Sequence, residues 1–166
     1  MLARAMTVTG FNKNLGFAIG ITLLIQGCSR TQESFLTVQT CLVDQQGVAQ
    51  FLETMRAVAK SENLKFVDGS AKTGESLKTI GADKSLKHDA ALTIHVGIEG
   101  EEGLGVTAGN LGLPPYQVAL GFTEGSDAAK AHRLSDKLVQ ALSQRWHVET
   151  VPQGEGALPM KSCGGA

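Results

Sequence analysis

Apolar and polar residues alternate in four stretches of the chain, which is the pattern of strands that cover a core with one face. These stretches are residues 35–43, 92–98, 104–108 and 116–123. Short turns join the last three, so the sequence predicts an antiparallel three-strand meander. Two shorter segments of extended character, residues 64–68 and 147–151, are also expected to be strands.

Two other stretches repeat apolar residues every three or four positions, which is typical of amphipathic helices. The first begins after Asp44, a favourable N-cap residue, and runs to Asn63. The second begins after Ser126, and its apolar stripe consists of Ala131, Leu134, Leu138, Leu142 and Trp146. Between them, residues 69–88 are polar and lysine-rich, and a helical turn or two is expected around Ser76–Ile80 because long structureless loops are uncommon.

Two amphipathic helices and one apolar sheet face can bury each other. We therefore predict an α+β fold, a two-layer sandwich in which a mainly antiparallel sheet carries both helices on one face. Residues 35–152 form this single domain, and residues 153–166 form an irregular, Gly/Pro-rich tail. The other face of the meander carries small and polar side chains, among them Thr93, His95 and Thr123, and is expected to be wet.

The N-terminal segment has the features of a secretory signal. Arg4 and Lys13 precede an apolar run, residues 15–25, that is too short for a membrane-spanning helix. The run ends in Ile25-Gln26-Gly27-Cys28, which resembles the lipobox of bacterial lipoproteins, with a departure at Gln26. The resemblance implies that residues 1–27 are cleaved and that Cys28 is acylated, with residues 28–34 as a lipidated tether.

The charge balance leaves the lipid as the means of membrane attachment. The signal holds two of the 15 basic residues and none of the 16 acidic ones, so the mature chain is slightly acidic. This composition argues against nucleic acid as a partner and against a polybasic membrane patch. Ser29 follows Cys28 where inner-membrane lipoproteins tend to have Asp, so the resemblance implies the outer membrane of a Gram-negative bacterium, with the domain in the periplasm.

With Cys28 used by lipid, Cys41 and Cys163 remain as a pair in an oxidising compartment. We expect a disulfide that joins the first strand to the tail. The alternative is one buried cysteine and one free thiol in the tail.

The sequence contains no pattern that predicts catalysis. The four histidines are not at metal-ligand spacing, and His95 and Glu99 lie about 13 Å apart along one strand. No metal site, no cofactor besides the covalent lipid and no enzyme activity are therefore expected.

Binding features are concentrated in one loop. Residues 109–116 place Leu111 and Leu113 between glycines and the pair Pro114-Pro115, followed by Tyr116. Apolar side chains on a rigid loop lose little entropy when they bind, so this loop is a candidate partner-binding surface. The alternative is that both leucines fold back over the core. A secondary candidate surface comprises Thr93, His95, Thr123 and the acidic turn residues Glu101 and Glu102.

Location, size and the loop together favour a periplasm-facing protein-binding module. The first hypothesis is an inhibitor or immunity protein that acts against an envelope-targeting hydrolase. The alternatives are an accessory subunit of an envelope assembly or lipid-transport machine, and a small periplasmic enzyme that uses the His95 face. A neighbouring gene for a secreted hydrolase would favour the first hypothesis, and a transport operon would favour the accessory subunit.

Overall fold

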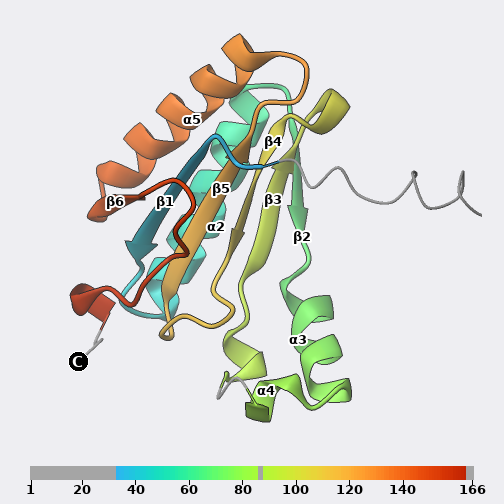
Figure 1. The fold of residues 1–166 in the computed structure, drawn as a ribbon, viewed down its shortest axis with the longest axis vertical. Helices are drawn as coiled ribbons and strands as arrows, with labels where there is room; N and C mark the ends of the chain where they lie inside the picture. Colours follow the sequence, from blue (N-terminus) through green and yellow to red (C-terminus); the bar gives the residue numbers. More distant parts are fainter. Residues whose placement is uncertain (1–32, 86–87, 164–166) are drawn as a thin grey trace, which may run out of the picture. The chain divides into compact units, whose positions relative to one another are not determined.

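A computed structural model describes residues 33–85 and 88–163, so the signal, Cys28 and most of the tether lie outside the described residues. The described part is built on one antiparallel sheet in the order β2-β3-β4-β5-β1-β6 (Figure 1). The strands are β1 Leu36–Cys41, β2 Lys65–Asp68, β3 His95–Glu99, β4 Gly105–Gly109, β5 Gln117–Thr123 and β6 Val148–Val151. The predicted meander is confirmed as β3-β4-β5.

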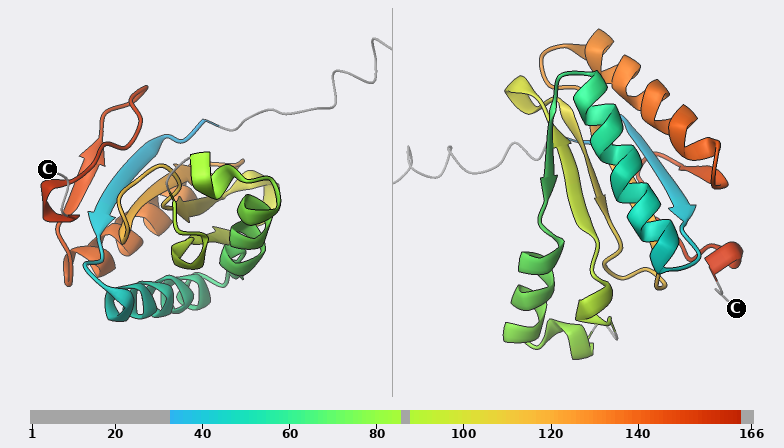
Figure 2. Two further views of the ribbon diagram at one scale, coloured as in Figure 1. Left: turned by 90° about the horizontal axis from the view of Figure 1, so that it is seen from below. Right: turned by 180° about the vertical axis from the view of Figure 1, so that it is seen from behind.

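Two long helices cover one face of this sheet (Figure 2). They are α2, Gln45–Ser61, and α5, Ala128–Ser143, and they pack against each other as well as against the strands. The N-cap of α2 is Asp44 as predicted, and its carboxylate accepts from Gly47 N at 2.8 Å. The N-cap of α5 is Asp127 rather than Ser126. The predicted α+β sandwich is thus confirmed.

The core lies between this sheet face and the two helices. Side chains with at most 2% exposure come from both layers: Phe51, Met55, Leu134, Leu138, Leu142, Val96, Ile98, Leu120 and Phe122. The partners in the register lie in rows across the sheet, such as Ile98, Val106 and Phe122 on β3, β4 and β5. Even-numbered positions of β3, β4 and β5 therefore face the helices, and odd-numbered positions form the opposite face.

Short helices fill the segment that the sequence left least defined. α3 spans Ser70–Thr79 and α4 spans Ala82–Ser85, beyond one end of β2 and β3 (Figure 1). A 3-10 turn, Ala90–Leu92, then leads to β3, which starts at His95. The expected surface position of Thr93 is therefore wrong. Thr93 precedes the strand, is only 7% exposed, and bonds His88 Nε2 through its hydroxyl at 3.1 Å.

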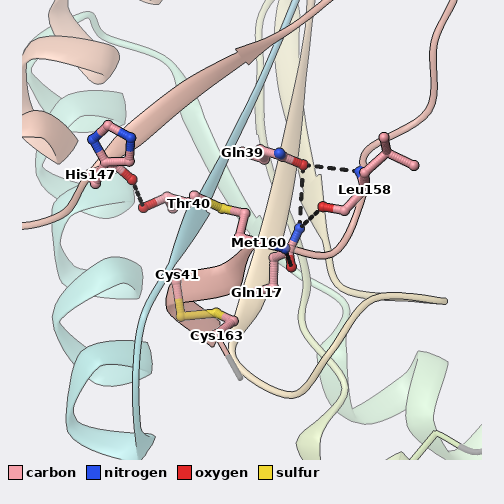
Figure 3. The surroundings of a disulfide bond; sticks show 8 residues. All are labelled: Gln39, Thr40, Cys41, Gln117, His147, Leu158, Met160 and Cys163. Carbon is pink, nitrogen blue, oxygen red and sulfur yellow. Dashed lines mark hydrogen bonds between the residues drawn. A yellow bond between two sulfur atoms is a disulfide. The ribbon is translucent and has the colours of Figure 1, made fainter. Parts of the chain in front are cut away.

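The C-terminal tail has no helix or strand before its last turn, and it is held against the sheet. Residues 152–163, which we call the strap, return across the uncovered face of β1 and β5 and end in a 3-10 turn, Lys161–Cys163. Cys163 forms the expected disulfide with Cys41 at the end of β1, with 5.5 Å between the Cα atoms (Figure 3). Among the described residues, no helix has both the length and the apolar character needed to cross a bilayer.

Candidate functional site

α2 and α5 leave one face of the sheet uncovered. Small residues make up much of this face in the region between the strap and α3. β3, β4 and the part of β5 that pairs with β4 place nine positions there, and five are glycine or alanine. We call these nine positions the open face: His95, Gly97, Glu99, Gly105, Thr107, Gly109, Ala119, Gly121 and Thr123. Because small side chains leave space above the backbone, this face is hollowed in two places.

The first hollow lies at the end of the open face where β4 connects to β5. Its volume is about 400 Å³, and we call it the leucine hollow. Its lining is mostly apolar: Ile94, Leu111, Leu113, Ala119 and Ala157, with Gly109, Gly112, Thr73 and His95. Leu111 is 45% exposed and Leu113 is partly buried, so neither leucine is a fully buried cap of the core.

Asn110 fixes the loop that carries the two leucines. The residue is fully buried, its Oδ1 accepts from Ile94 N at 2.8 Å, and its Nδ2 donates to Leu92 O at 2.8 Å. Asn110 O also accepts from Leu113 N at 3.1 Å, which closes a turn around Leu111 and Gly112. The side-chain amide thus replaces the ladder bonds that are missing where β4 ends. The turn composition of residues 109–116 indicated a loop, but this positioning role of Asn110 was not predicted.

His95 stands between the leucine hollow and the second hollow. Its Nδ1 shares a hydrogen bond of 2.7 Å with Thr73 Oγ1 of α3, and its backbone N–H donates to Ser70 Oγ at 3.1 Å. These contacts tie the start of β3 to α3 and fix the orientation of the ring. Hydroxyl and imidazole at this distance are also the arrangement of a nucleophile and its base. Thr73 was not singled out from the sequence, because its partner lies 22 residues further along the chain.

The second hollow, of about 380 Å³, follows β3 and β4 toward the other end of the open face. His95, Glu99, Thr107 and Thr123 supply its polar lining, and Gly97 and Gly105 of the open face form part of its floor. Part of this glycine content has a packing reason: a Cβ at Gly105 would overlap the Ile98 carbonyl, and one at Gly121 would lie 2.6 Å from Ser34 Oγ. The small floor is therefore partly a requirement of close strand packing.

The predicted partner-binding loop is divided by the structure. Leu111 and Leu113 line the leucine hollow, whereas Pro114, Pro115 and Tyr116 do not. Tyr116 is half-buried against the edge of the core, and its carbonyl accepts from Leu42 N at 2.8 Å. Tyr116 holds the end of the loop against the body of the domain, whereas Pro115 is exposed.

The secondary candidate surface is divided as well. Thr123 belongs to the open face, but its hydroxyl donates to Gly103 O at 2.7 Å, beside the exposed residues Glu101 and Glu102. This acidic turn lies at the end of the strands opposite to Leu111, so it does not join the leucine hollow. Of the secondary candidates, only His95 reaches both hollows.

The remaining histidines have structural neighbours. His132 lies 3.6 Å from Glu124 and edge-on to the Phe35 ring, and His147 lies 3.3 Å from Glu149. Within residues 33–85 and 88–163, no three His, Cys, Asp or Glu side chains gather as ligands for a metal ion. The chain matches no model of a known protein family, and no curated protein matches it either.

Proposed function

We propose that this protein is a lipid-anchored binding module of the bacterial envelope that holds a protein partner in the leucine hollow. The observation that carries the proposal is the exposure of Leu111, 45%, on a loop that Asn110 holds in place. Together with Leu113, this side chain lines an apolar hollow of about 400 Å³. A concave, mainly apolar site with a few polar groups is the usual form of a binding site.

The energetic gain from such a site is substantial for its size. Burying one leucine side chain in a partner contributes about 1.5–3 kcal/mol. Because Asn110 already fixes the loop, little ordering entropy is lost on binding. Burial of Leu111 in a pocket of the partner would therefore supply a measurable part of the binding free energy.

The position of the hollow in the fold supports a partner in the periplasm. Residue 33 enters the sheet at the end where Leu36 pairs with Phe122, whereas Leu111 lies beyond the other end, where Cys41 pairs with Gln117. The six residues of β1 separate these ends by about 20 Å. A lipid anchor at Cys28, five residues before residue 33, holds the tether end nearer to the outer membrane and leaves the leucine hollow accessible from the periplasm.

Within this class we favour an inhibitor or immunity protein whose loop occludes an envelope-targeting hydrolase. The accessory subunit of an assembly or lipid-transport machine is the alternative that uses the same hollow. A small periplasmic enzyme is the second candidate function, and the 2.7 Å pair of Thr73 Oγ1 and His95 Nδ1 is the observation that favours it.

Site-specific photo-crosslinking in the cell tests the proposal. A crosslinking side chain at position 111 should form an adduct with a partner protein. The same side chain at position 80 should not, although Ile80 is even more exposed, 76%, and is also apolar. A hydrolase in the adduct indicates inhibition, and a subunit of an envelope machine indicates the accessory role. Equal adducts at both positions would contradict the proposed site.

Leu111→Asp provides the matching functional test, with Ile80→Asp as control. Leu111→Asp should abolish the adduct formed through a crosslinker at position 113 while the melting temperature stays within about 2 °C of the parent, because an exposed side chain contributes little to stability. A large loss of stability would show that the loop is structural. His95→Gln should leave the adduct intact. If this variant loses a hydrolytic activity of the parent while the adduct stays intact, the result favours the hypothesis of a small periplasmic enzyme.

A further inference from the structure

The side-chain amide of Gln117 binds the backbone of the strap. It offers one donor and one acceptor, as the backbone of an edge strand does to a neighbouring strand. Gln117 is fully buried on β5, its Nε2 donates to Leu158 O at 2.6 Å, and its Oε1 accepts from Met160 N at 2.8 Å (Figure 3). One amide thus satisfies a carbonyl and an N–H two residues apart on an extended segment. Gln39 of β1 adds a third bond, because its Oε1 accepts from Leu158 N at 3.2 Å.

Only one side chain of this segment is deeply anchored. Met160 is 3% exposed, whereas Leu158 is 65% exposed although it makes two of the three backbone bonds. Backbone bonds that fix the chain, together with a pocket for one side chain, are how extended peptides are recognised on protein surfaces. The strap adds no strand to the sheet, so the sheet is complete without it.

We propose that the face formed by Gln39 and Gln117 is a peptide-docking site whose occupant in this structure is the chain's own Leu158–Met160. A partner segment with the same chemistry, an extended stretch with an apolar residue at the Met160 position, replaces the strap when it is released. This site adjoins the leucine hollow, which Ala157 of the strap helps to line, but its hydrogen bonds do not involve Leu111 or Leu113. The inference does not depend on the function proposed for that hollow.

The Cys41–Cys163 disulfide keeps the internal occupant in place. The bond makes docking of the strap intramolecular, which gives it a high effective concentration over any free peptide. Release requires a dithiol reductant. One of its thiolates attacks the sulfur of Cys163, which is less buried than Cys41, and Cys41 leaves as a thiolate. The second thiol of the reductant then displaces Cys163, so the dithiol is oxidised to a disulfide and both cysteines of the chain become thiols.

A full-length variant with a displaced strap tests the docking site. Met160→Glu combined with Cys163→Ser removes the buried apolar side chain of the strap and the disulfide. The probe is a fluorescein-labelled peptide with the sequence of residues 155–162, and its anisotropy reports capture. The displaced variant should bind this probe at least tenfold more tightly than the disulfide-bonded parent. Leu158→Glu with the disulfide intact is the control, because Leu158 is exposed and its replacement should leave the strap docked.

The specificity of capture decides the outcome. A probe with Glu in place of Met160 should not bind, and Gln117→Ala in the displaced variant should weaken capture at least tenfold. Leu111→Asp should leave capture unchanged, which separates this site from the leucine hollow. The proposal is overturned if the folded variant ignores the probe, captures the Glu probe equally well, or only pairs with a second copy through exchanged straps. Should Met160→Glu prevent folding, the parent chain must capture the probe under dithiothreitol and not without it.

Discussion

Removing the disulfide should cost the domain a large part of its stability. Cys41 and Cys163 lie 122 residues apart, so the bond closes a loop that spans nearly the whole described chain. In the chain-entropy model, a crosslink over a loop of this length stabilises the folded state by about 5 kcal/mol, because it restricts the unfolded chain. This value is the starting point for the double replacement of both cysteines by alanine.

The folded state offsets part of this loss. Without the disulfide, the strap is held by three hydrogen bonds and by the buried side chain of Met160. Each hydrogen bond contributes about 1 kcal/mol, and the burial of Met160 contributes about 2 kcal/mol. Ordering the backbone of residues 152–163 costs conformational entropy that these few contacts do not offset, so the strap should detach. Removing a native disulfide from a small domain commonly costs about 2–5 kcal/mol, and we expect a decrease in the free energy of unfolding of about 3–4 kcal/mol here.

Urea denaturation measures this decrease. With a slope of about 2 kcal/mol per M, the midpoint should move down by about 1.5–2 M. The parent chain under reducing conditions should unfold at the same urea concentration as the double variant. Limited proteolysis of the double variant should remove residues after Val151 first. A decrease below about 1 kcal/mol, or a strap that resists proteolysis, would refute the reasoning.

Three further predictions concern single positions. Cys28→Ala should block processing and leave the larger precursor, and mass spectrometry of the mature parent should find an acylated residue 28 and no residues 1–27. Gly105→Ala should destabilise the domain by about 2 kcal/mol or more, because its Cβ would overlap the Ile98 carbonyl; Gly156→Ala meets nothing within 4 Å and should be neutral in the same thermal melts. Asn110→Ala should cost about 2–4 kcal/mol by urea denaturation, because two buried backbone groups lose their partners.

Elements whose residues interact with their neighbours in sequence could be predicted. The alternation in residues 104–108 and 116–123 and the helical stripe after Asp127 depend on one buried face each, so periodicity located them to within a few residues. The disulfide was predicted from the number of cysteines and the expected compartment. The exposure of Leu111 was one of two open alternatives, and only the structure decides between them.

Features that depend on distant contacts could not be predicted. The helix α3 has only Gly74 and Leu77 as buried residues, and it packs closely against the turn before β3, where a Cβ at Gly74 would lie 2.5 Å from the Ala90 carbonyl oxygen. Thr93 was assigned to the open face because the alternation was extended through residue 92, but a 3-10 turn there changes the direction of the chain. The role of Gln117 was missed because its partners lie some 40 residues away in a tail without periodicity.

The position of β1 has a consequence for how the protein is made. The first strand lies between β5 and β6, so its two neighbours are the last two strands to be synthesised. A chain that ends before β6 cannot complete the sheet. The pairings of β1 with β5 and β6 join residues about 80 and 110 positions apart, and such long-range contacts slow folding. The sheet therefore stays incomplete until the last strand, β6, has been made and can pair with β1.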